Sequence, residues 1–230
     1  MTLPHIDGAP VGEHQLVCRL IKGIFHQRPP QRRVYQPWDV GKVLAVFSSW
    51  SSPLDFKQLQ RKTAFLIAMA TARRPSELAS LRCSPAFMSR SSAGVRFIPS
   101  ALSKTDRHSH LGPPITISRL DSEDTSFCPV SSLDALLRMR QELGIRHDYV
   151  FCDFRHPHAK ISSAAFARRL AWPLRRAGIS APPSSTRSVS VSDAFARGVD
   201  LEAILNAGDW SGAQTFYRHY LRPSSASFHQ

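Results

Sequence analysis

Apolar residues along the chain follow two periodicities, which predict a mostly helical domain with one small sheet. Residues 54–72 place apolar side chains at helical spacing, so densely that this helix should be buried on several sides. Two short segments, 94–99 and 114–118, alternate polar and apolar positions and predict an antiparallel pair of strands. Apolar spacing and helix-ending glycines predict the remaining helices at residues 38–47, 133–143, 162–177, 188–197, 201–207 and 214–221. The predicted fold class is mainly α with a small antiparallel β-sheet (α+β).

The N-terminal part of the chain is organised differently. Residues 13–25 predict a short helix with one apolar face, which is too small to form a domain. The basic, proline-containing segment 28–33 is unsuited to a helix and predicts a linker. We therefore expect a helical stub with a basic Pro-rich linker at 1–36, a main domain at 37–223 and a disordered tail at 224–230.

The charge of the chain favours a polyanionic partner. The 230 residues include 30 Lys+Arg against 17 Asp+Glu, a formal net charge of +13, and only six of the basic residues are lysines. The guanidinium fork of arginine suits bidentate contacts to phosphate, although a solvated arginine-rich surface would give the same composition. The apolar run at 63–72 is too short to span a bilayer, and the N-terminus lacks the features of a signal peptide.

Several classes of site are disfavoured by the motifs. The four cysteines have no CxxC spacing, so neither a disulfide framework nor a zinc finger is expected, and a reducing compartment is favoured. The chain also lacks a nucleophile elbow, a phosphate-binding P-loop and the paired acids of a two-metal nuclease. Cys152, His156 and His158 form a weak metal candidate, for which a surface loop is the favoured alternative.

The segment with the most chemical content follows the predicted buried helix. It reads Thr-Ala-Arg-Arg-Pro-Ser-Glu-Leu, with Arg74 and Glu77 at the start of a new helix whose first turn suits Pro75. Taken alone, this pattern is typical of a helix cap with an ordinary ion pair at i, i+3.

Three further segments change that interpretation. They are Ser-Ser-Thr-Arg at 184–187, Gly-Asp-Trp at 208–210 and Thr-Phe-Tyr-Arg-His-Tyr at 215–220. Together with Ala-Arg-Arg-Pro-Ser-Glu-Leu-Ala-Ser-Leu at 72–81, they resemble the tyrosine recombinase (phage integrase) superfamily. The segments at 16–44, 72–81, 185–192 and 209–220 are similar to those of recombinases from DIRS-type, Ngaro-like retrotransposons, and they are spread over most of the chain.

The resemblance implies the tyrosine recombinase catalytic-domain fold and a site-specific recombinase or integrase. Such an enzyme cleaves and rejoins double-stranded DNA through a 3′-phosphotyrosyl intermediate, with no metal and no nucleotide cofactor. Tyr220 is the implied nucleophile because of its spacing from Thr215 and Phe216, and Tyr217 remains the alternative. The other implied catalytic residues are Arg74, Lys104, Ser184, Arg187 and Trp210, with Glu77 in a supporting position.

The implied chemistry gives each of these residues a role. Arg74 and Arg187 would hold the non-bridging phosphate oxygens, Trp210 would donate an N–H or form a wall of the pocket, and Lys104 would protonate the leaving 5′ oxygen. Further arginines are predicted to contact DNA phosphates, with a solvated helix face as the alternative: Arg73, Arg168, Arg169, Arg175 and Arg176.

One position departs from the family pattern. Where the family has the histidine of its H-x-x-R motif, this chain has Ser184, which can hydrogen-bond a phosphate but cannot act as a near-neutral acid or base. A catalytically impaired DNA-binding remnant is therefore the alternative to an active recombinase. A basic helical module that binds DNA or RNA, with accidental motifs, is a third hypothesis.

The resemblance also implies a cellular context. Members of this family self-associate on paired DNA sites, and an element of the DIRS type would use the enzyme for DNA recombination and integration. We therefore expect a nuclear or otherwise intracellular protein that is not secreted and has no membrane partner.

Overall fold

The chain forms two compact units, Met1–Tyr35 and Gln36–Gln230. The computed structural model describes residues 5–6, 8–29, 37–101, 112–156, 159–210 and 212–221. The first unit contains a hairpin of β1 (His5–Ile6) and β2 (Ala9–Pro10), followed by α1 (Gln15–Gln27), whose apolar side chains are exposed. The two units are described separately below.

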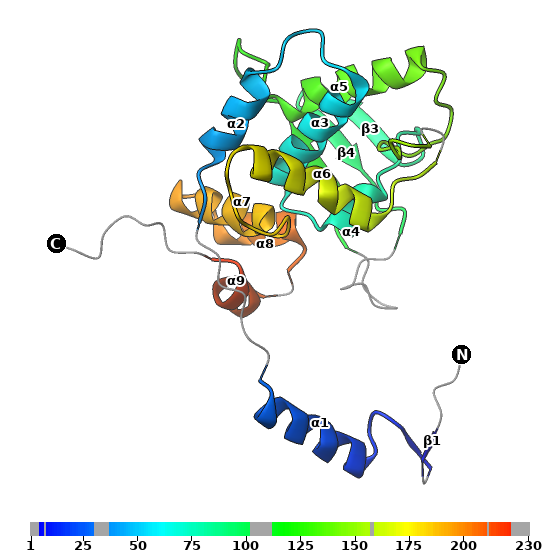
Figure 1. The fold of residues 1–230 in the computed structure, drawn as a ribbon, viewed down its shortest axis with the longest axis vertical. Helices are drawn as coiled ribbons and strands as arrows, with labels where there is room; N and C mark the ends of the chain where they lie inside the picture. Colours follow the sequence, from blue (N-terminus) through cyan, green and yellow to red (C-terminus); the bar gives the residue numbers. More distant parts are fainter. Residues whose placement is uncertain are drawn as a thin grey trace, which may run out of the picture. The chain divides into compact units, whose positions relative to one another are not determined.

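The second unit is mainly helical (Figure 1). Its helices are α2 (Val40–Ser48), α3 (Phe56–Thr71), α4 (Pro75–Ala79), α5 (Pro129–Glu142), α6 (Ser163–Arg176), α7 (Ser185–Ala196), α8 (Leu201–Gly208) and α9 (Ala213–His219). Helix α3 lies at the centre and contacts α5, α6 and α7. In the described part of the chain, no helix combines the length and apolarity that a membrane span requires.

Helix α3 is central because it carries apolar residues on most of its sides. Its N-terminus is stabilised by a capping box. Asp55 accepts the backbone N–H of Gln58, and the Gln58 side chain accepts the backbone N–H of Asp55, which forms a capping box. Phe65 and Ile67 are fully buried in the main hydrophobic core. The predicted dense burial of this helix is confirmed.

A three-stranded antiparallel sheet accompanies the helices. The strands β3 (Met88–Ser91), β4 (Gly94–Phe97) and β5 (Ile115–Ser118) pair in the order β3-β4-β5. The predicted pair corresponds to β4 and β5, whose inward residues are buried. The sequence analysis missed β3 because this strand, Met-Ser-Arg-Ser, is polar and largely exposed, so it shows no apolar alternation. The predicted α+β fold class is confirmed.

A second, smaller core joins the C-terminal helices to the end of α3. It consists of Ala72, Val191, Ile204, Trp210 and Phe216, which come from the end of α3, from α7, from α8 and its C-terminal end, and from α9. The start of α7 is anchored separately, because the indole Nε1 of Trp38 donates to Ser185 Oγ at 2.8 Å. Positions far apart in the sequence are thus held beside the end of α3.

Candidate active site

The first candidate residues stand at the junction between α3 and α4. Ala72 ends α3 in the left-handed conformation (φ 50°), and Pro75 starts α4. The Glu77 carboxylate accepts the backbone N–H of Arg74 at 2.7 Å and its Nη1 at 3.0 Å. The Arg74 side chain is 23% exposed, so its guanidinium is fixed by Glu77 and still partly open to solvent.

Arg187 lies opposite, on the first turn of α7. It is 5% exposed, and its Nη2 donates to the carbonyl of Gly208. Its Nε and Nη1 are buried and have no hydrogen-bond partner in the described part of the chain. Burial lowers the pKa of Arg187 to about 10; the charge of Tyr220 raises this pKa, that of Arg74 lowers it, and Glu77 and Arg73 add smaller opposing effects.

Two aromatic rings cover the Arg187 guanidinium. The carbon centre of the guanidinium lies 4.0 Å from the Trp210 ring centroid and 4.9 Å from the Tyr220 centroid, and the two rings are 4.7 Å apart. Trp210 is 8% exposed, and its buried indole Nε1 lacks a hydrogen-bond partner among the described residues. Arg187, Trp210 and Tyr220 therefore form one compact cluster.

The two candidate tyrosines occupy different surroundings. Tyr220 follows α9 and lies against Arg187 and Trp210. The Tyr217 side chain is 48% exposed and packs beside Phe195 and Phe216. Of the two tyrosines, Tyr220 is therefore the one that lies in the cluster with Arg187 and Trp210.

The cluster has the properties of an anion site beside a phenol. Three buried N–H groups, Nε and Nη1 of Arg187 and Nε1 of Trp210, have no partner in the described chain. Buried donors left unpaired are rare in folded proteins and often mark a ligand or catalytic position. A phosphate oxygen is a strong acceptor for such donors, and arginine is well suited to it.

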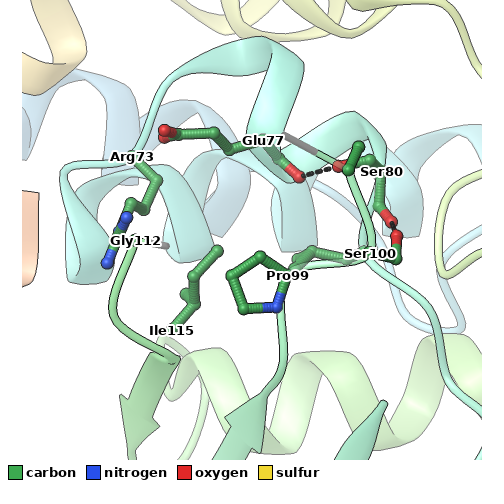
Figure 2. Close-up of a pocket in the computed structure, with 9 residues that line it drawn as sticks. Arg73, Glu77, Ser80, Pro99, Ser100, Gly112 and Ile115 are labelled. Atoms are coloured by element: carbon green, nitrogen blue, oxygen red, sulfur yellow. Dashed lines mark hydrogen bonds between the residues drawn. The ribbon is translucent and has the colours of Figure 1, made fainter. Parts of the chain in front are cut away.

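A pocket lined by Arg73 lies between α4 and the ends of β4 and β5 (Figure 2). In it, the Ser80 hydroxyl donates to the Glu77 carbonyl and the Ser100 hydroxyl donates to the Ser80 carbonyl. Its lining residues are Arg73, Glu77, Ser80, Leu81, Pro99, Ser100, Ala101, Gly112 and Ile115. Ala101 and Gly112, which line this pocket, are the described residues on either side of the segment that contains Lys104.

Two candidate residues remain to be located. Lys104 falls outside the described residues. Ser184 is exposed and immediately precedes α7, three residues before Arg187, and its side chain makes no capping hydrogen bond. Its hydroxyl is therefore available to a ligand on the surface of the site.

The predicted DNA-contacting arginines divide into two groups. Arg168, Arg175 and Arg176 are exposed. Arg73 and Arg169 are each 4% exposed, which places both inside the protein and not on the predicted phosphate-contacting surface. Arg73 Nη2 donates to the Pro113 carbonyl at 3.0 Å.

Arg169 is buried because of its position on α6. It lies three residues after Phe166 and one before Leu170, both in the core, so the helical period turns it inward. Its Nη1 donates to Gln60 Oε1 at 2.6 Å and its Nη2 to the Cys152 carbonyl. Burial lowers the pKa of Arg169 to about 9. The sequence analysis treated all arginines of this helix alike, whereas the period distinguishes this one.

The metal candidate gains no support from the described residues. Cys152 is fully buried and His156 is exposed, while His158 lies outside the described chain. In the described ranges, no three His, Cys, Asp or Glu side chains are grouped so that they could hold a metal ion.

Asp209 is a site residue that the sequence analysis missed. Its carboxylate is 7% exposed, and Oδ2 lies 3.9 Å from Nη1 of both Arg73 and Arg74. Asp209 ends α8 with φ 55°, a conformation that the Gly-Asp pair at a helix end can indicate. That signal predicts the turn but not the distant arginines.

Comparisons with known proteins identify the fold. The sequence matches no protein-family model and no curated protein. Among solved structures, the chain is similar to XerA recombinase, with a TM-score of 0.59, 18% sequence identity, and coverage of 92% of this chain and 71% of that chain. It is also similar to XerH site-specific recombinase bound to difH substrate, with a TM-score of 0.58, 14% identity, and coverage of 78% of this chain and 47% of that one.

A third similar structure is a lambda integrase tetramer bound to a Holliday junction, with a TM-score of 0.57 and 14% identity. The match covers 93% of this chain and 58% of the integrase, so this chain spans only about half the length of XerH and of lambda integrase. At such low identity the likeness concerns architecture. The helical domain with its small antiparallel sheet has the fold of a tyrosine recombinase catalytic domain.

Proposed function

We propose that this chain is the catalytic part of a tyrosine recombinase that cleaves and rejoins duplex DNA through Tyr220. The observation that carries the proposal is the set of buried, unpartnered N–H groups of Arg187 and Trp210 beside the Tyr220 ring. These donors would stabilise the charge that develops on the phosphate oxygens in the transition state. The similar structures, which include a pre-cleavage complex of XerH and a lambda integrase tetramer bound to a Holliday junction, support the same chemistry.

In the proposed reaction, the Tyr220 oxygen attacks the phosphorus of a DNA phosphodiester. The bond from phosphorus to the tyrosine oxygen forms and the bond to the 5′ oxygen breaks; the tyrosine gives up its proton and the leaving 5′ oxygen takes one. Arg74 and Arg187 hold the non-bridging oxygens, and Lys104 protonates the leaving oxygen. Attack by the free 5′ hydroxyl reverses the step, so the bond energy is kept and no nucleotide cofactor is required.

The side chains must rearrange for this chemistry. Arg187 is 5% exposed and lies under the Tyr220 and Trp210 rings, so a phosphate reaches Nε and Nη1 only after the Tyr220 ring moves aside. The same movement would bring the phenol oxygen from its stacked position to the phosphorus.

The sequence resemblance supports a biological context for the proposed recombinase. The DIRS-like motifs support a mobile-element recombinase that acts in the nucleus and promotes integration. The neighbours include dimers and tetramers of lambda integrase on DNA, which supports self-association of this chain on paired sites.

A covalent trapping experiment tests the proposal. The protein is incubated in EDTA with nicked, labelled duplexes that carry element-terminal sequences, and denaturation-resistant protein–DNA adducts are resolved on a gel. We expect an adduct with the wild type and with Tyr217→Phe, and none with Tyr220→Phe. Salt-sensitive DNA binding without any adduct would contradict the proposal and favour the impaired remnant.

Ser184 gives that second candidate function its specific support. The exposed hydroxyl at this position cannot act as the acid or base that imidazole provides. Ser184→His should increase strand cleavage strongly if the site is impaired only at this position. An unchanged cleavage yield would indicate that another group acts in its place, or that the chain only binds DNA.

A further inference from the structure

A single buried carboxylate faces two consecutive arginines at the site. Asp209 Oδ2 lies 3.9 Å from Nη1 of Arg73 and 3.9 Å from Nη1 of Arg74. The three side chains are 6%, 2% and 23% exposed, respectively, so their charges interact at the edge of the core and not in bulk water. At this separation and burial, the Coulomb interaction is stronger than between surface charges.

Asp209 holds this place in an unfavourable backbone conformation. Its φ of 55° is left-handed, and its backbone N–H closes the end of α8 by donating to the Asn206 carbonyl. Glycine or asparagine could adopt the same left-handed conformation, and glycine would do so without steric cost. Neither residue would place a charge in the interior. A buried carboxylate is costly unless it is compensated, so its presence here reflects its interaction with the arginines.

The residues on either side of Asp209 contact the other half of the site. The Gly208 carbonyl accepts a hydrogen bond from Arg187 Nη2, and the Trp210 ring lies 4.0 Å from the Arg187 guanidinium. Three successive residues, 208–210, therefore contact Arg73, Arg74 and Arg187, which come from two segments more than a hundred positions apart. This tripeptide links the two arginines that would hold one phosphate.

We propose that Asp209 is a positioning residue, which holds the Arg74 guanidinium in register with Arg187 and ties the Trp210–Tyr220 segment to the end of α3. The inference rests on the proposed function. Asp209 itself does not contact the reacting atoms. It neutralises part of the charge of Arg73 and Arg74, and with Glu77 it gives Arg74 a carboxylate on a second element of the fold.

Two substitutions test this role without disturbing the turn. Asp209→Asn and Asp209→Gly both tolerate the left-handed conformation and remove only the charge or the side chain. With saturating DNA, we expect the single-turnover rate of adduct formation to fall by about 10–100-fold, as is typical when a partner that orients a reactive group is lost. DNA affinity should stay within about twofold, because the phosphate-contacting side chains remain.

The matched control is Asp193→Asn, which removes a carboxylate from an exposed pair with Arg197 on α7. It should change neither the rate nor the affinity. A rate for Asp209→Asn within twofold of the wild type would overturn the inference.

A second readout separates this inference from the proposed function. The side-chain Nε–H signals of Arg73 and Arg74 in a ¹⁵N NMR spectrum should shift in Asp209→Asn and stay unchanged in Asp193→Asn. This holds even if the wild type forms no adduct, an outcome that would refute the proposed function alone. Unchanged arginine signals in Asp209→Asn would refute the positioning role.

Discussion

Among single residues, Arg187 shows the conflict between stability and proposed chemistry. Its guanidinium is 5% exposed, two of its nitrogen atoms lack a partner in the described chain, and burial lowers its pKa to about 10. A charge held under these conditions destabilises the folded protein. Retaining it is understandable if a phosphate supplies the missing acceptors.

Arg187→Met should therefore abolish adduct formation while keeping or raising the thermal stability. Methionine fills much of the same volume and removes the buried charge. The measurements are the trapping assay and the melting temperature. A large fall in melting temperature would show that Arg187 is mainly a structural residue.

The pH dependence of this stability difference has a defined sign. In the folded protein Arg187 loses its proton near pH 10, whereas in the unfolded chain it stays protonated to a higher pH. The unfolded state thus binds more protons above pH 10, and the stability of the wild type rises relative to Arg187→Met. Denaturant unfolding of both proteins at pH 9 and pH 10.5 should show that any excess of the unfolding free energy of Arg187→Met over that of the wild type becomes smaller at the higher pH. A larger excess at pH 10.5 would contradict the burial argument.

At the scale of the element, α6 shows how one helix gives its arginines different roles. Arg168 is exposed, while Arg169 is buried and bonded to Gln60 and to the Cys152 carbonyl. The one-residue step rotates the side chain by about 100° around the helix axis, which is enough to move it from solvent into the core.

We expect Arg168→Gln to affect DNA binding and Arg169→Gln to affect stability. Arg168→Gln should weaken DNA binding and reduce the salt slope of the binding constant by about one, with no loss of stability. Arg169→Gln should leave buried acceptors unpaired and cost about 1–3 kcal/mol of unfolding free energy, with an unchanged salt slope. Salt-dependent DNA titrations and denaturant unfolding decide the matter, and a reduced slope for Arg169→Gln would contradict its interior position.

The end of α8 positions the indole of Trp210. A Cβ atom at Gly208 would lie 1.8 Å from a ring atom of Trp210, whereas a Cβ at Gly212 would meet nothing within 4 Å. The absence of a side chain at Gly208 therefore allows the indole to lie against the helix end and over Arg187.

Gly208→Ala should displace Trp210, cost about 1–3 kcal/mol of stability through overpacking and slow adduct formation. Gly212→Ala is the control with open space, and it should leave the rate unchanged. Tryptophan fluorescence reports the displacement of the indole. Equal adduct rates in the two variants would show that the position of Trp210 does not matter to the reaction.

At the scale of the whole molecule, local periodicity was sufficient for most elements. It predicted the buried α3, the β4–β5 pair and the C-terminal helices, because these carry strong apolar patterns. It missed β3, whose residues are polar and exposed. Asp209 could not be assigned a partner from the sequence, since its arginines lie about 135 positions away and the contact depends on the assembled fold.

The motifs were informative for the site because each combines several residues at fixed spacing. Separate motifs contribute Arg74, Arg187, Trp210 and Tyr220. The fold brings the last three into one cluster, and Arg74 is close enough to lower the pKa of Arg187. The list of DNA-contacting arginines was weaker, because it rested on charge without a test of which helix face each arginine occupies.

The most direct test of the central claim is to identify the residue that becomes linked to DNA. Trypsin cuts after Arg218 and so places Tyr217 and Tyr220 in different peptides, one of residues 198–218 and one that begins at His219 and continues past Arg222, because Pro223 blocks cleavage there. The trapped adduct is digested with nuclease and trypsin and analysed by mass spectrometry. We predict a phosphonucleotide at Tyr220 on the peptide that begins at His219; a modification on the 198–218 peptide, or no modified peptide at all, would contradict the account.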